Sequence, residues 1–195
     1  MIGKTIAIVL AGGQSARMGK DKAEIRIDGA RMIDRAIYSL RKQDCDIIIS
    51  ASHDYGTGLQ YVQDLENGPR GPVAALFAGY KSLKNVSDID GFITVPVDSP
   101  NFPDNLVKRL KSDDHSQIAA GPDRIHPTFG WWRLSDLKEM FDFEMLDGKI
   151  SLTVLAKQLG AKTVTWKGEN LLLNINDPND LNAYLTAKSP PHKES

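Results

Sequence analysis

One stretch near the start of the chain combines residue types that can bind phosphate groups. An apolar run ends in the pair Gly12 and Gly13, and Arg17 and Lys22 follow shortly after. Glycines let the backbone approach an anion closely, and successive N–H groups form an anion-binding concavity. The stretch therefore predicts a loop that wraps a triphosphate, with Arg17 and Lys22 neutralising its charge. The alternative interpretation is a solvated surface loop with incidental charges.

This stretch fits neither of two common phosphate-binding motifs. The dinucleotide fingerprint needs G-x-G-x-x-G, but Gly12 and Gly13 are adjacent. The P-loop needs G-x-x-x-x-G-K followed by Ser or Thr, but five residues separate Gly13 from Gly19. Asp21 also follows Lys20 at the place where the Ser or Thr should be. A P-loop NTPase is therefore disfavoured.

A second candidate is Asp98, which directly follows the apolar run at residues 91–97. A carboxylate at the C-terminal end of a buried strand lies where open α/β sheets place their ligands. Magnesium is bound by one or two carboxylates together with phosphate oxygens and water, so a lone aspartate can serve. We predict that Asp98 is a ligand of Mg²⁺. The alternative is that it caps the turn before Pro100.

Short apolar runs alternate with helical patterns along the chain, which predicts an α/β fold built from βαβ units around a largely parallel sheet. Strands are predicted at residues 5–10, 46–51, 91–97, 117–120, 126–132 and 162–166, with a short one within 23–29. Helices are predicted around residues 32–40, 73–83 and 106–110, from a cap at Ser135 towards Leu146, from a cap at Ser151 to Leu159, and over 179–187 after Asp177 and Pro178.

Composition narrows the class of protein. The chain has 195 residues, of which 41% are hydrophobic and 25% charged, and its formal net charge is −1. We predict one domain over residues 1–188 and a disordered polar tail at 189–195. The near-zero charge argues against nucleic acid as a partner, and no apolar segment is long enough to suggest a membrane span. The single Cys45 excludes an intrachain disulfide framework, and a cytoplasmic location is expected.

The glycine-containing stretch resembles the signature of a known enzyme family. The string L-A-G-G-x-S-x-R-M-G-x-D-K is similar to that of nucleotidyltransferases of the molybdenum cofactor guanylyltransferase type. The matching positions are Leu10, Ala11, Gly12, Gly13, Ser15, Arg17, Met18, Gly19, Asp21 and Lys22. The resemblance implies a three-layer, Rossmann-like nucleotide-diphospho-sugar transferase fold with a mostly parallel mixed sheet.

Later stretches extend the resemblance over most of the chain. Residues 64–76 resemble the family's Asp followed by a Gly-Pro-Leu-Ala-Gly turn, which implies that Asp64 binds the guanine nucleotide; a surface Asp in a helix-entry loop is the alternative. Residues 95–103 resemble the family's Pro-Cys-Asp-Thr/Ser-Pro segment around the aspartate predicted above.

Two further stretches could contribute to an acceptor site. Residues 125–133 resemble a His-Pro-Leu-Phe-Ala-Leu strand, so His126 either lines the acceptor pocket or is a core histidine, and the two following tryptophans are expected to pack. Residues 174–181 resemble Asn-Ile-Asn-Thr-Pro-Glu-Asp-Leu, so Asn174 and Asn176 are acceptor or metal candidates. Helix capping is a sufficient role for Asp177.

The resemblance implies an Mg²⁺-dependent enzyme that transfers GMP from GTP to the phosphate of molybdopterin and releases pyrophosphate. Because the acceptor phosphate is already an anion, catalysis requires positioning and cationic stabilisation rather than a general base. The implied catalytic residues are Arg17, Lys22 and Asp98. The implied site residues are Leu10, Ala11, Gly12, Gly13, Lys22, Asp64 and Asp98 for GTP, and His126, Asn174 and Asn176 for the acceptor. Transient contacts with proteins that deliver molybdopterin or mature molybdoenzymes are also implied.

One position departs from the family pattern. The family often has an Asn after the second strand that contacts the nucleotide, and Ser52 stands there in this chain. Guanine presents donors at N1–H and its amino group, and a Ser offers them fewer acceptors than an Asn amide. A molybdopterin cytidylyltransferase or another small nucleotidyltransferase therefore remains an alternative, and a non-catalytic nucleotide-binding module is a further one.

Overall fold

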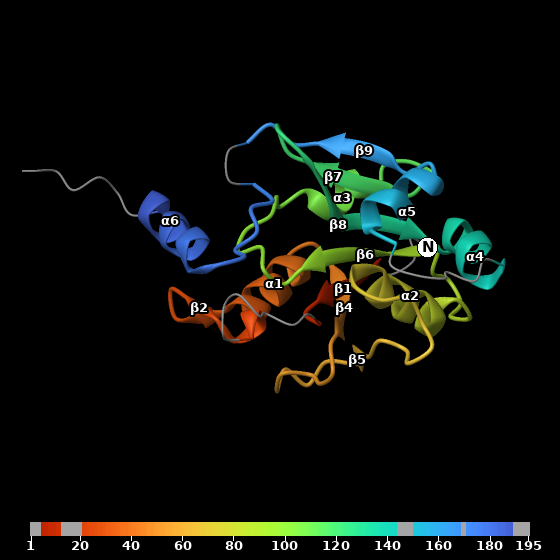
Figure 1. Ribbon diagram of the computed structural model, residues 1–195, viewed down its shortest axis with the longest axis horizontal. Helices are drawn as coiled ribbons and strands as arrows, with labels where there is room; N and C mark the ends of the chain where they lie inside the picture. The colour runs from red at the N-terminus through yellow and green to blue at the C-terminus, as the bar shows by residue number, and fades with distance from the viewer. Residues whose placement is uncertain (1–4, 13–20, 144–149, 169–170, 189–195) are drawn as a thin grey trace, which may run out of the picture.

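A seven-stranded sheet forms the centre of the computed structural model, which describes residues 5–12, 21–143, 150–168 and 171–188 (Figure 1). The strand order is β5-β4-β1-β6-β8-β7-β9. These strands are β1 (Thr5–Leu10), β4 (Cys45–Ser50), β5 (Tyr61–Val62), β6 (Gly91–Pro96), β7 (Gln117–Ala120), β8 (Ile125–Arg133) and β9 (Lys162–Thr165). All neighbouring pairs are parallel except those that β8 makes with β6 and β7. The predicted mostly parallel mixed sheet is confirmed.

The sheet is buried on both faces, which explains its continuous apolar runs. On β1, Ala7 and Val9 belong to one hydrophobic cluster and Ile8 to another, because successive side chains of a strand point to opposite faces. Helices α1 (Met32–Arg41) and α3 (Leu106–Leu110) supply the first cluster, and α2 (Pro72–Leu83), α4 (Leu134–Phe143) and α5 (Leu152–Gln158) supply the second. This arrangement is the predicted three-layer architecture.

Local signals set several helix ends as predicted. Gly71 has φ 73°, a conformation that favours glycine, and Pro72 occupies the first turn of α2. The Ser151 side chain accepts a hydrogen bond from the Val154 N–H and caps α5. Asp177 Oδ1 accepts from the N–H groups of Asn179 and Asp180 at 2.8 and 3.0 Å, and so caps the last helix, α6 (Pro178–Lys188).

Other boundaries differ from the sequence predictions. The cap at Ser135 is wrong because β8 runs directly into α4, which begins one residue earlier at Leu134, and the Leu134 N–H donates to the Asp90 carbonyl oxygen. The predicted end of that helix at Leu146 and the predicted tail at 189–195 lie outside the described residues. The short strand predicted within 23–29 is confirmed as β2 (Arg26–Ile27), which pairs with β3 (Ala30–Arg31) in a small hairpin, but a 3₁₀ turn, η1 (Lys22–Glu24), occupies the start of that range.

The hairpin and α6 pack together at one end of the molecule (Figure 1). Their shared apolar cluster contains Ile27 from β2, Ile175 from the segment before α6, and Tyr184 from α6. This packing brings a segment from the end of the chain to the turn that follows the glycine-containing stretch. Among the residues that the structure describes, none of the helices has the length and apolar character that a membrane span requires.

Candidate functional site

The carboxyl ends of three neighbouring parallel strands form one wall of a large cavity. Leu10, Ser50 and Pro96 end β1, β4 and β6 and are in register across the sheet. Ligands of open α/β sheets bind at this edge. The cavity has a volume of about 830 Å³. Its lining residues are Leu10, Ala11, Gly12, Asp21, Lys22, Ala51, Ser52, Tyr55, Gln63, Asp64, Gly71, Pro72, Ala75, Pro96, Val97, Asp98, Thr128 and Asn174.

Lys22 is held in this cavity by the turn in which it lies. Asp21 Oδ1 accepts a hydrogen bond from the Ala23 N–H at 2.9 Å and caps η1. Asp21 Oδ2 accepts another from the Tyr55 hydroxyl at 2.8 Å, which ties the turn to the loop after β4. Asp21 therefore orients the residue that follows it.

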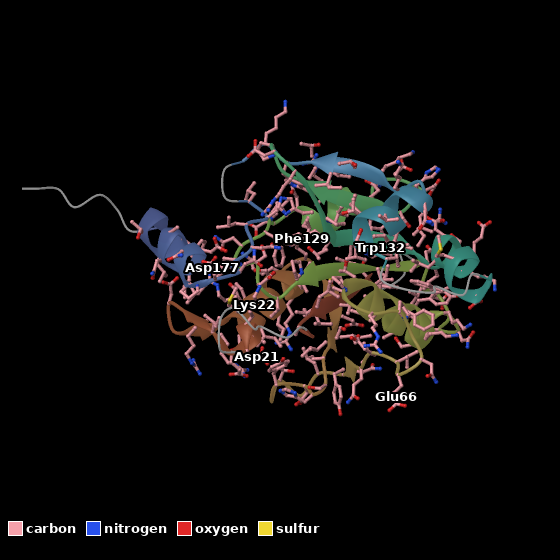
Figure 2. All side chains as sticks on the ribbon, in the orientation of Figure 1. Asp21, Lys22, Glu66, Phe129, Trp132 and Asp177 are labelled. Atoms are coloured by element: carbon pink, nitrogen blue, oxygen red, sulfur yellow. The ribbon has the colours of Figure 1, made fainter. Side chains whose placement is uncertain are left out.

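The Lys22 ammonium group makes two polar contacts. Its Nζ lies 2.7 Å from Asp98 Oδ2 and 3.0 Å from Asn176 Oδ1. The side chains of Lys22 and Asp98 are only 19% and 17% exposed, so water screens this ion pair less than one on the open surface. In Figure 2, Lys22 is labelled near Asp177, the residue that follows Asn176 in the chain.

The segment containing the two predicted asparagines is fastened to the end of β6. The Ile175 N–H donates to the Asp98 carbonyl oxygen at 2.8 Å, and the Ser99 hydroxyl donates to the Leu173 carbonyl oxygen at 2.7 Å. The Asn176 N–H donates to Asp180 Oδ2 at 2.8 Å, which connects the segment to α6. The structure thus brings together Lys22, Asp98 and Asn176, with Asn174 in the same cavity wall.

Two buried oxygen atoms in this cavity have no hydrogen-bond partner in the described structure. They are Asp98 Oδ1 and Asn174 Oδ1. Buried polar atoms are nearly always paired, so such atoms call for an explanation. Carboxylate and amide oxygens are the hard ligands that Mg²⁺ accepts. The residues present therefore fit a magnesium ion.

The N-terminal stretch contributes backbone to the cavity wall. The N–H groups of Ala11 and Gly12 both donate to the Ser50 carbonyl oxygen, at 3.0 and 2.7 Å. These two N–H groups are thus engaged with β4 instead of being directed at a ligand. The predicted Gly13 and Arg17 lie outside the described residues.

The remaining predicted residues separate into two groups. Asp64 lines the cavity, and partial enclosure by the cavity walls raises the pKa of its carboxyl group. His126 is not among the lining residues; it is buried beside Phe129, with ring centroids 6.5 Å apart, and burial lowers the pKa of its imidazole. Trp132 is fully buried and lies well away from Lys22, as expected of a packing residue (Figure 2).

Tyr55 and Gln63 are among the side chains of the cavity wall that sequence reasoning missed. Tyr55 has φ 54°, and its hydroxyl group is buried against Asp21, which raises its pKa. The Gln63 amide reaches Ser52 on the neighbouring loop. Neither residue lies in a recognisable motif, and β5, which places Gln63, was not predicted because it has only two residues.

Comparisons with known proteins point to one enzyme family. The family described as the MobA-like NTP transferase domain matches residues 7–158. A molybdenum cofactor guanylyltransferase from Cereibacter sphaeroides is 29% identical over 185 residues, which cover 91% of this chain and 94% of the relative.

Two solved structures have the same fold. The molybdopterin-guanine dinucleotide biosynthesis protein A from Archaeoglobus fulgidus superposes with a TM-score of 0.71 at 16% identity, covering 94% of this chain and 98% of its own. A 4-diphosphocytidyl-2C-methyl-D-erythritol synthase from Anaerococcus prevotii gives 0.66 at 17% identity, covering 94% and 99%. The fold is that of nucleotide-diphospho-sugar transferases. With the family match extending from β1 into α5, this chain belongs to the MobA-like NTP transferase family.

Proposed function

We propose that this protein transfers GMP from GTP to the phosphate of molybdopterin, with or without bound molybdenum, and releases pyrophosphate. The observation that carries the proposal is the placement of Lys22 Nζ against Asp98 Oδ2 and Asn176 Oδ1 inside the cavity at the carboxyl edge of the sheet. The functions named for relatives that align over nearly the whole chain support the choice of substrates.

In the proposed reaction, an acceptor phosphate oxygen attacks the α-phosphorus of GTP. A new P–O bond forms, the bond between the α-phosphorus and the bridging oxygen breaks, and pyrophosphate leaves with the electron pair. The acceptor oxygen is already anionic, so the chain need not supply a base. What the chain must supply is positive charge and alignment, since an anion approaches a polyanion. Lys22 supplies this charge in the described part of the site, and Arg17 is proposed to add a second cation.

We propose that Mg²⁺ binds at Asp98, with Asn174 as a second oxygen ligand. When bound, the ion neutralises charge on the phosphates. No cluster of three or more His, Cys, Asp or Glu side chains that could hold a metal occurs in the described ranges. A site with few protein ligands suits Mg²⁺, which commonly takes the rest from phosphates and water.

The nucleotide and the acceptor are proposed to occupy different parts of the site. Asp64 and Ser52 line the part near α2, where we place the guanine base. Asn174 and Asn176 lie beside Lys22 and Asp98, where the phosphate groups must meet, and we place the acceptor phosphate there. His126 stays a prediction as an acceptor residue.

A nucleotide panel tests this function. Purified protein with Mg²⁺ and molybdopterin-loaded acceptor is given GTP, CTP, ATP or UTP, and pyrophosphate release is followed. Release with GTP that depends on the acceptor is expected. Preference for CTP would instead identify the protein as a cytidylyltransferase. Phosphate release without acceptor would indicate an NTPase, and the absence of any release would favour a nucleotide-binding module.

A further inference from the structure

A glutamine outside the recognised motifs lies at the base end of the cavity. Gln63 follows β5 directly, lines the cavity, and donates from Nε2 to the Ser52 carbonyl oxygen at 2.9 Å. A carbonyl oxygen can only accept, so the amide nitrogen must face Ser52. The other end of the amide, Oε1, is then an acceptor without a donor among the described residues.

The neighbouring serine already makes two polar contacts. Its carbonyl oxygen accepts from Gln63, and its hydroxyl lies 3.1 Å from His53 Nδ1. Ser52 stands where the sequence comparison expects an amide side chain. The structure places an amide at this point nonetheless, but it comes from the adjoining strand.

The chemistry of this wall matches the donor edge of guanine. Gln63 Oε1 is an acceptor, and the carboxylate of Asp64 adjoins it in the chain and also lines the cavity. Pro72 and Ala75 add apolar surface from the start of α2. Guanine offers N1–H and a 2-amino group as donors on one edge. Adenine has only its 6-amino group there, next to an N1 acceptor that would face acceptor oxygens.

We infer that Gln63 is a specificity-determining residue whose Oε1 accepts a hydrogen bond from the 2-amino group of guanine while its Nε2 holds the Ser52 loop. This inference rests on the proposed function, because it assumes that the nucleotide is GTP. It assigns to Gln63 the amide acceptor that a serine at position 52 does not provide.

The test compares the binding of three nucleotides to the wild type and to a variant, and it needs no acceptor substrate. Dissociation constants for GTP, inosine triphosphate and ATP are measured by calorimetry on the full chain, in the wild type and in Gln63→Met. Inosine triphosphate keeps N1–H and O6 but lacks the 2-amino group. Gln60→Met is the matched control, because Gln60 is exposed on the same segment and is not a lining residue.

If Gln63 recognises guanine, Gln63→Met weakens GTP binding about five- to tenfold, the size of one hydrogen bond, and changes inosine triphosphate and ATP by less than about twofold. The preference for GTP over inosine triphosphate then disappears, and Gln60→Met leaves it unchanged. Gln63→Glu, which retains an acceptor but cannot donate to Ser52, is expected to keep that preference.

If Gln63→Met weakens the binding of all three nucleotides equally, Gln63 only holds the Ser52 loop in place. If the preference for GTP over inosine triphosphate is unchanged, Gln63 takes no part in base recognition. Either result overturns this inference and leaves the proposed function intact. A wild-type protein that binds GTP no better than ATP would overturn both.

Discussion

Replacing Lys22 by Met tests whether this residue binds the triphosphate. Lys22→Met removes the ammonium group and keeps an unbranched side chain of similar length. A hydrogen bond from a charged group contributes about 1.5–3 kcal/mol. Lys22 already donates to Asp98 and Asn176, so nucleotide binding exchanges these contacts for phosphate oxygens. The lower end of that range applies, which corresponds to a roughly tenfold loss of GTP affinity.

Binding of GMP provides the internal comparison. GMP keeps the α-phosphate but lacks the charge of the β- and γ-phosphates, so its affinity is expected to fall less than that of GTP in Lys22→Met. Both dissociation constants are measured by calorimetry with Mg²⁺ present. Equal losses for GTP and GMP, or no loss for either, would refute the assignment of Lys22 to the triphosphate.

The chain offers a matched control in Lys84. This residue at the C-terminal end of α2 also pairs with an aspartate, Asp142, at 3.0 Å, and the two side chains are 28% and 18% exposed. Each variant breaks one partly buried ion pair and should lower the urea midpoint of unfolding, but Lys84→Met leaves Asp142 paired with Lys138 at 2.9 Å and should lower it less. Only Lys22→Met should change GTP affinity, because Lys84 lies at the other end of α2 from the cavity.

Two other predictions concern single residues. Asp98→Asn is expected to fold but to lose turnover by several orders of magnitude, because it removes the carboxylate proposed to hold Mg²⁺; near-normal turnover with Mg²⁺ in the pyrophosphate assay would contradict the metal assignment. Burial lowers the pKa of His126 below its ordinary 6.5, so the unfolded chain takes up the proton first and stability falls as the pH drops below about 6.5. His126→Gln should flatten the loss of unfolding free energy between pH 7 and 5, and an unchanged slope would contradict this assignment.

The sequence by itself determined the longer strands and several helix ends of this protein. Strands such as β1 and β6 can be predicted from the sequence, because a continuous apolar run is typical of a strand that is buried on both faces. The start of α2 follows from Gly71 and Pro72, and that of α6 from Asp177, since each signal acts through backbone contacts within a few residues. The position of Asp98 at a strand end was equally visible.

Only the tertiary structure decided how the separate motifs meet. Lys22 and Asn176 are 154 positions apart in the chain, and they touch because Ile175 pairs with the Asp98 backbone while α6 packs on the β2–β3 hairpin. The approach of Gln63 to Ser52 depends on the two-residue pairing of β5 with β4, which is too short to have a periodic signal. Local sequence patterns reflect steric and capping interactions between residues that are close together in the chain. Which distant segments dock together depends on hydrogen bonds and apolar contacts that form only when the chain has folded.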